Sequence, residues 1–293
     1  MKIRPVFFMR LKADLTLLFV TILWGSAFAV MRVAAGHGSV FFLNGLRFCL
    51  GAVLLLPFTK LRGAFNRSNL VYIGLAGFAL YVAVGLQQAG LVTTTSGNAG
   101  FITSLYVVIV PLLLWIFWRE RPSPLTGVAV LMAIAGGFLL STAGSFQIRP
   151  GDVLIFVGSL FWAMHVVVVS RMQGKIAPFP FALGQFAVCG VLNLVTGLFV
   201  EHPLLAQMLA LIPAIIYTGV FSIAIGFTLQ VVAQKHTPAN DAALIMSLEA
   251  VFAVLFGWLF LHEMLLPVQW SGCVLILAAV VLVQFKNGKM KES

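Results

Sequence analysis

Two charged residues stand inside long apolar stretches of this sequence, where an ionisable side chain is costly and marks a candidate functional site. Glu249 lies ten residues into the apolar run 239–261, and Arg47 lies seven residues into the run 40–58. Glu249 suits a proton carrier or a cation-binding carboxylate, and the planar guanidinium of Arg47 suits recognition of a substrate carboxylate. Alternatively, the two charges pair with each other and only hold helices together. The sequence leaves both interpretations open.

Neutral polar and aromatic residues in the same apolar runs complete a candidate binding site. His165 follows Trp162 by three residues, and Asn44 precedes Arg47 by three, so each pair shares one helix face. Gln185 takes the place of Arg47 in the second half of the chain. We predict Glu249 as the proton-coupling group and the following residues as substrate contacts: Trp24, Asn44, Arg47, Tyr81, Phe101, Tyr106, Trp162, His165 and Gln185.

The motifs of membrane-embedded enzymes and of ATP-driven pumps are missing from the sequence. It has no HExxH, no GxSxG, no GxxxxGK[ST] and no paired Asp motif that would hold magnesium. Cys49, Cys189 and Cys273 lie inside apolar runs without CxxC spacing, which indicates neither a disulfide framework nor a metal cluster. We predict that the chain is not an enzyme and has no catalytic residue, metal or cofactor.

The candidate residues must be positioned by helices that cross a membrane. The 293 residues are 61% hydrophobic and 9% charged, which excludes an ordinary soluble globule. The apolar runs are continuous and about twice the length of a barrel strand, which excludes a β-barrel. We predict an all-α polytopic membrane protein with ten transmembrane helices, each about 20 residues long. The predicted spans are 15–36, 40–58, 70–90, 95–117, 124–142, 152–170, 179–200, 208–232, 239–261 and 267–285.

The distribution of Lys and Arg between the connectors predicts the orientation. One set of alternate connectors, including both termini, holds fifteen of them, whereas the opposite set holds only Arg32 and Arg149. Because short cytoplasmic loops collect positive charge, we predict that both termini are cytoplasmic. The net charge of +10 then reflects topology, and no nucleic-acid partner is expected.

The chain repeats itself internally. A shift of 138 residues overlays ADLTLLFVTILWG on GDVLIFVGSLFWA, and a shift of 143 overlays residues 96–124 on 239–267 with ten identities in 29 positions. We predict two repeats, 1–147 and 148–293, of five spans each. An odd number of spans means that the second repeat enters the membrane inverted. Inverted repeats are typical of secondary transporters, and a fused pair supplies both walls of a cavity within a monomer.

Four acidic residues at the ends of predicted spans are interpreted as structural. Glu120 and Glu263 correspond under the shift of 143, and both lie beside loops. Asp14 and Asp152 correspond under the shift of 138 and stand at the predicted starts of helices. A carboxylate there caps free N–H groups and opposes the helix dipole.

Three segments resemble the drug/metabolite transporter superfamily in its ten-helix EamA-type branch: ILWGSAFAVMR at 22–32, LRFCLGAVLLLP at 46–57, and TPANDAALIMSLEAVFAVLFGWLFLHE at 237–263. The resemblance covers nearly the whole chain. It is most specific in the last segment, which keeps the family's spacing at Glu249, Gly257, Trp258 and Glu263. The sequence departs from the family at Ala250, where proline usually follows the glutamate, and has Pro111 in the first half instead.

The resemblance implies a multi-pass transporter of the inner or plasma membrane that moves amino acids or other small metabolites, often outward. We predict a secondary active exporter of small polar metabolites that works as a monomer in the bilayer by alternating access. Coupling to protons through Glu249 is a hypothesis. The alternatives are an uncoupled, channel-like pathway and an importer of a small metabolite. The sequence does not identify the substrate.

Overall fold

The computed structural model describes residues 3–142, 149–264 and 266–289, and within them every regular element is a helix. This confirms the all-α prediction. The elements in chain order are α1 (Ile3–Ala35), α2 (Val40–Leu55), η1 (Leu56–Phe58), α3 (Arg67–Leu91), α4 (Ser96–Ser104), α5 (Tyr106–Trp118), α6 (Pro124–Thr142), α7 (Pro150–Arg171), α8 (Pro178–Val200), α9 (Leu205–Tyr217), η2 (Thr218–Phe227), α10 (Thr228–Ala233), α11 (Ala239–Met246), α12 (Glu249–Leu261) and α13 (Pro267–Lys289).

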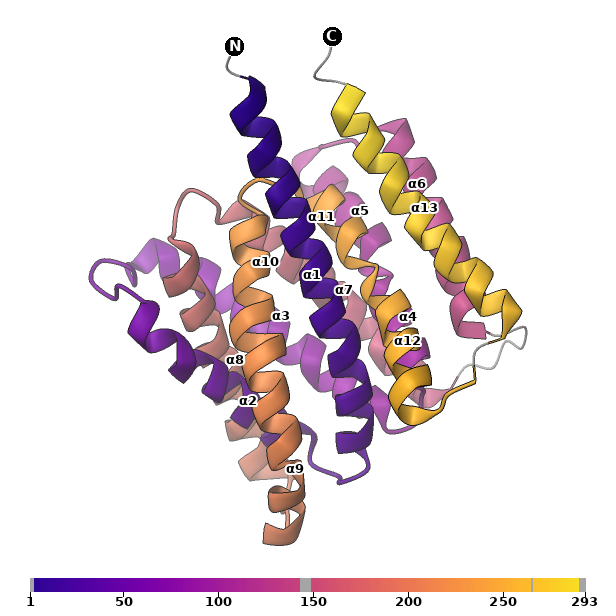
Figure 1. Cartoon of the computed structure of the whole chain (residues 1–293). Coiled ribbons are helices and arrows are strands. Elements are labelled where there is room, and N and C mark those ends of the chain that lie inside the picture. Colours follow the sequence, from indigo (N-terminus) through magenta and orange to yellow (C-terminus); the bar gives the residue numbers. More distant parts are fainter. Residues whose placement is uncertain (1–2, 143–148, 265, 290–293) are drawn as a thin grey trace.

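These elements build the ten predicted membrane crossings. Eight helical segments of the described chain are long and apolar enough to cross a membrane, and α6 and α13 supply two shorter apolar stretches. These two helices pack side by side at one edge of the molecule (Figure 1). Large apolar side chains face outward, such as Phe199, which is 81% exposed, and Leu131, which is 67% exposed. Such a surface suits hydrocarbon rather than water.

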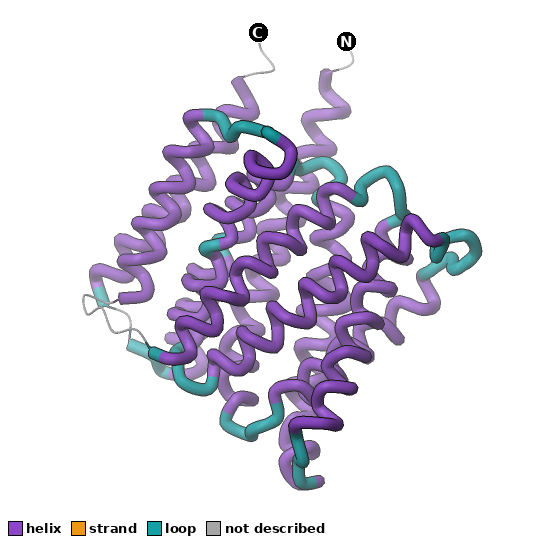
Figure 2. The backbone as a smooth tube through the Cα atoms, turned by 180° about the vertical axis from the view of Figure 1, so that it is seen from behind, coloured by secondary structure: helices purple, strands orange, loops and turns teal. Residues whose placement is uncertain are grey.

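Both ends of the described chain lie at the same end of the helix bundle (Figure 1), and the loops gather at its two ends (Figure 2). An even number of crossings requires this arrangement. The first helix begins at Ile3, well before the predicted start at residue 15. Asp14 therefore lies inside a helix, and the prediction that it caps a helix start was wrong.

Two predicted spans are each divided into two half-helices. The run 95–117 breaks at Leu105, between α4 and α5, and the run 239–261 breaks between α11 and α12, at residues 247–248. The breaks fall at positions that match under the shift of 143. At each break a serine hydroxyl donates to the carbonyl three residues earlier over 2.7 Å, from Ser104 to Phe101 and from Ser247 to Leu244. The second break forms although this chain has Ala250 at the position where the resemblance implies a proline.

The eighth crossing is also composite. It runs from α9 through the ten-residue π-helix η2 into α10. A π-helix of this length is unusual, and π-helical turns are frequent at functional sites. The sequence predicted a single helix over 208–232 and gave no sign of this change in winding.

The first helix runs through the middle of the bundle in Figure 1, where it contacts α12, η2, α10, α3 and α4. Its approach to α12 depends on Gly25. A Cβ atom at this position would lie 2.8 Å from the carbonyl carbon of Phe252 and 2.9 Å from the backbone nitrogen of Ala253. Only glycine allows the two backbones to come so close.

Candidate functional site

A cavity lies in the middle of the bundle, beside both helix breaks. It contains about 580 Å³ of space that no atom fills, including the part that opens to the exterior. Its aromatic lining consists of Trp24, Phe28, Tyr106, Trp162 and Phe227. Its other polar lining residues are Arg47, Gln87, Thr103, His165, Ser222, Gln230 and Glu249. An apolar pocket with a few convergent polar groups is the expected form of a small-molecule site.

Glu249 and Tyr106 meet in this cavity because each is the first residue after a helix break. The side chain of Glu249 is 4% exposed, and its Oε1 atom has no hydrogen-bond partner among the described residues. The Tyr106 hydroxyl interacts electrostatically with this carboxyl group but forms no hydrogen bond of normal geometry. A buried polar atom without a partner is costly, which makes this carboxyl group a candidate for binding a ligand or a proton.

Arg47 extends from α2 into the cavity, and a neighbouring residue that does not line the cavity fixes its position. Its Nε atom donates to Oδ1 of Asn44 over 2.9 Å, and Nδ2 of Asn44 donates to the carbonyl of Val84 over 3.2 Å. The guanidinium lies 5.4 Å from the ring centroid of Phe48. No described carboxylate pairs with Arg47, so the ion pair with Glu249 that the sequence left open is not formed. Its terminal nitrogens have no acceptor among the described residues and remain available to a ligand.

His165 is oriented in a similar way by a residue that does not line the cavity. Its Nε2 atom lies 2.9 Å from Oε1 of Gln185, whereas its Nδ1 atom has no partner among the described residues. Its ring stands edge-on to Phe227, with ring centroids 5.8 Å apart. Gln185 itself does not line the cavity. Asn44 and Gln185 therefore act here as positioning residues.

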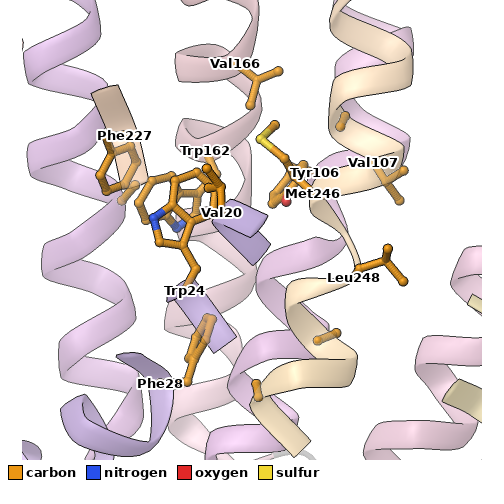
Figure 3. Packing of buried hydrophobic residues seen from close by; sticks show 14 of the residues in the cluster. Val20, Trp24, Phe28, Tyr106, Val107, Trp162, Val166, Phe227, Met246 and Leu248 are labelled. Carbon is orange, nitrogen blue, oxygen red and sulfur yellow. The ribbon is translucent and has the colours of Figure 1, made fainter. Parts of the chain in front are cut away.

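The aromatic wall is built around Phe227, next to the two tryptophans that match under the shift of 138 (Figure 3). Its ring centroid lies 4.7 Å from that of Trp24 and 5.8 Å from that of Trp162, to which it is stacked. The indole of Trp24 also donates to the carbonyl of Ser222 over 3.2 Å. These contacts fix an aromatic surface on one side of the cavity, in which Trp162 is stacked on Phe227 and Trp24 is tilted against it by 45°.

Six of the ten predicted site residues line the cavity: Trp24, Arg47, Tyr106, Trp162, His165 and Glu249. Of the remaining four, Asn44 and Gln185 are the positioning residues described above. Tyr81 and Phe101 do not line the cavity. The Tyr81 hydroxyl lies 2.8 Å from Oγ1 of Thr196. Phe101 is buried against α6, where a Cβ at Gly137 would clash with its ring.

The sequence analysis missed several polar residues of the lining, among them Gln87, Thr103 and Gln230. Nε2 of Gln87 donates to Oγ1 of Thr103 over 2.9 Å, and Oε1 of Gln230 has no partner among the described residues. Two signals were available. Gln87 and Gln230 correspond under the shift of 143, and Thr103 precedes Tyr106 by one helical turn.

The four acidic residues at the membrane surfaces have partners of their own. Oδ2 of Asp152 accepts the backbone N–H of Arg149 over 2.9 Å and caps α7. Glu263 accepts the hydroxyl and the N–H of Ser96, at the start of α4, over 2.9 and 3.3 Å. Glu120 pairs with Arg171 over 2.6 Å. Asp14 pairs with Arg10 over 3.0 Å.

No group of three His, Cys, Asp or Glu side chains that could hold a metal ion occurs in the part of the chain that the structure describes. The cavity chemistry therefore rests on one guanidinium, one carboxyl group, an imidazole, neutral polar groups and aromatic rings.

Comparison with known proteins identifies the family. The sequence model of the EamA-like transporter family matches residues 11–142 and, a second time, residues 149–285. The chain belongs to the EamA-like transporter family. It is 34% identical over 277 residues to an uncharacterized transporter of Archaeoglobus fulgidus, covering 94% of this chain and 87% of the relative. It is 28% identical over 272 residues to the uncharacterized inner membrane transporter YedA of Escherichia coli K12, covering 89% and 87%.

A solved structure supports the fold of this EamA-like transporter. A protein of known crystal structure that is 18% identical superposes with a TM-score of 0.75, covering 95% of this chain and 98% of that one. The chain is therefore a multi-pass membrane transporter, whose family implies a small-molecule substrate and a surrounding lipid bilayer. The names of the family and of its members indicate transport rather than catalysis.

Proposed function

We propose that this EamA-like transporter is a secondary active exporter of small polar metabolites, with zwitterionic amino acids as the substrate class. The observation that carries the proposal is the pair of opposite charges in one cavity, Arg47 and Glu249, neither of which has an ion-pair partner among the described residues. An α-amino acid offers a carboxylate and an ammonium group that complement these two side chains. The aromatic rings of Trp24, Trp162 and Phe227 offer an apolar surface for the side chain of the amino acid.

Each contact has a physical reason. The free terminal nitrogens of Arg47 form a planar fork that binds a carboxylate through two parallel hydrogen bonds. Asn44 holds the Nε atom of this fork and fixes its direction. The unpartnered Oε1 of Glu249 accepts a hydrogen bond from the substrate ammonium group.

Proton coupling follows from competition at Glu249. The carboxylate form attracts an ammonium group, whereas the protonated form does not. A proton that binds from one side therefore displaces the substrate, and a substrate that binds from the other side displaces the proton. This exchange makes an antiporter, in which an inward proton gradient drives export.

We propose alternating access between two inverted repeats, 1–147 and 148–293, within a monomer of the inner or plasma membrane. The matched helix breaks and the two matches of the family model support the repeats. The charge asymmetry supports cytoplasmic termini. Thiol labelling of single cysteines tests the orientation. The connector 59–69 should react from inside and the connector 201–207 from outside, and the reverse pattern would overturn it.

The substrate class is tested by flux into proteoliposomes with an imposed pH gradient. A library of amino acids should be compared with the matching amines, which lack the carboxylate, and the matching carboxylic acids, which lack the ammonium group. We expect pH-driven accumulation of amino acids and little of either analogue. Equal accumulation of an amine would contradict the role of Arg47, and flux that ignores the pH gradient would favour the uncoupled pathway.

A further inference from the structure

Two buried hydrogen bonds tie together segments that are far apart in sequence, and they correspond to each other. Oγ1 of Thr237 donates to Oδ1 of Asp14 over 2.7 Å, and Oγ1 of Thr94 donates to Oδ1 of Asp152 over 2.6 Å. The threonines match under the shift of 143 and the aspartates under the shift of 138. Both aspartates are 7% exposed, and both threonines are buried.

Each bond lies between the central cavity and one end of the bundle. Gln230 lines the cavity, and Thr237 follows it by seven residues. Gln87 lines the cavity, and Thr94 again follows by seven residues, beyond the end of α3. Asp14 is in the first crossing, near the termini, whereas Thr94 follows the third crossing and lies at the opposite end.

Each bond also joins one proposed repeat to the other. Asp14 on α1 belongs to the first, and Thr237, between α10 and α11, belongs to the second. Asp152 on α7 belongs to the second, and Thr94, between α3 and α4, belongs to the first. Because each bond joins the two repeats, a movement that separates them at that end must break it.

We propose that the Asp14–Thr237 and Asp152–Thr94 bonds are the two gates of the transporter, one at each end of the cavity. This inference rests on alternating access, which is part of the proposed function. Both bonds are formed in this structure. In the transport cycle, the two bonds break alternately.

The two gates differ in their surroundings. At the termini end, Arg10 bridges Asp14 and Asp241, with 2.7 Å between its Nη2 atom and Oδ2 of Asp241. At the opposite end, the residue that matches Asp241 is the neutral Asn98, whose Nδ2 donates to Asp152 over 2.8 Å. Both aspartates accept charge-assisted hydrogen bonds, but at the termini end the additional donor is itself a cation, so that gate should open less readily.

The test measures access to the cavity from each side. Cys49, Cys189 and Cys273 are replaced by serine, and Ser222, which lines the cavity, becomes the single cysteine. Labelling by a membrane-impermeant maleimide is followed in vesicles of both orientations, with the termini side identified by protease access to an N-terminal tag. Loss of one hydrogen bond should raise the labelling rate about fivefold. The assay needs neither substrate nor pH gradient, so absence of flux would contradict the proposed function and leave the gates standing.

The variants are matched in size and differ in the hydroxyl. Thr94→Val should raise labelling only from the side opposite the termini, and Thr237→Val only from the termini side. Thr94→Ser and Thr237→Ser, which keep the hydroxyl, should label like the parent. Equal increases from both sides, or no increase from either, in a protein that elutes as a single folded species would overturn the proposal and leave the two bonds as structural ties.

Discussion

The segments 94–120 and 237–263 share their backbone geometry at their far ends and carry different side chains at their centres. At the far ends, Arg119 and His262 both adopt left-handed backbone, with φ of 59° and 54°. In both segments the residue after them donates its N–H over 3.2 Å to the carbonyl six residues earlier, from Glu120 to Leu114 and from Glu263 to Gly257. At the centres, by contrast, Tyr106 stands in the first segment and Glu249 in the second.

The same division applies to the other crossings around the cavity. Trp24 and Trp162 correspond and both line it, whereas Arg47 corresponds to the neutral Gln185. The first half thus supplies the only guanidinium of the described lining, and the second half supplies its only carboxyl group. The two halves of the chain thus share an aromatic residue at the cavity, and each supplies one of its two charges.

The largest effect is expected from removing the positive charge of Arg47, which has no charged counterpart in the second half. Arg47→Gln copies Gln185 and should lower kcat/KM for amino acids about 100-fold, because the substrate carboxylate loses its only cationic partner. Arg47→Lys should also lower kcat/KM, by about tenfold, because a point charge does not reproduce the bidentate fork. Flux in proteoliposomes measures both. Wild-type flux by Arg47→Lys would reduce Arg47 to a structural charge.

A difference in backbone packing gives the next prediction. Gly25, where α1 comes close to the backbone of α12, corresponds to Ala163, which carries a methyl group. Gly25→Ala copies the second half, but its methyl group would meet backbone atoms of α12 that cannot move aside. We expect a loss of about 1–3 kcal/mol in stability and a Tm in detergent lower by several degrees.

Gly74→Ala is the control for this loss. A Cβ atom at Gly74 has no neighbour within 4 Å, and alanine is the better helix former. Its Tm should be unchanged or slightly higher. If both variants unfolded at the same temperature as the parent, the close approach of α1 to α12 would not be rigid.

A smaller effect is expected from a positioning residue. Asn44→Ala removes the acceptor that holds Nε of Arg47, so KM should rise about fivefold while kcat changes little. Tyr81→Phe is the matched control, because its hydroxyl contacts Thr196 away from the cavity and its loss should leave KM unchanged. If Tyr81→Phe raised KM as much as Asn44→Ala does, the substrate site would not be confined to this cavity.

The smallest effect concerns the matched glutamates. The side chain of Glu120 is 52% exposed and pairs with Arg171, so Glu120→Gln should change stability by less than about 1 kcal/mol. Glu263→Gln should cost more, because the carboxylate accepts a backbone N–H at the start of α4. Paired thermal melts decide the order, and a larger cost for Glu120→Gln would contradict it.

Hydropathy was sufficient to predict the ten crossings, because a continuous apolar run of about 20 residues is typical of a membrane-spanning helix. It did not predict the breaks at residues 105 and 247–248, since neither break changes the composition of its run. It also placed the start of the first helix too late, because the charged residues before Asp14 look like a tail when only hydropathy is read. The helix in fact continues through them.

The candidate site was predicted best where depth and symmetry agreed. Glu249 and the two tryptophans were found because they are unusual residues at matched or central positions. Tyr81 and Phe101 lie in membrane crossings but on faces that do not reach the cavity. A helix that is apolar all round carries little periodic signal, so the sequence does not show which face turns inward.

The most direct test of the charged asymmetry is proton-driven accumulation by Glu249→Gln in proteoliposomes. The amide keeps the size of the side chain, and folding is checked by elution as a single species. We predict that pH-driven accumulation of amino acids is lost, while exchange of substrate down its own gradient continues, because the variant has no group that alternates between proton and ammonium. Full pH-driven accumulation by the folded Glu249→Gln protein would contradict this account and leave Glu249 as part of the scaffold.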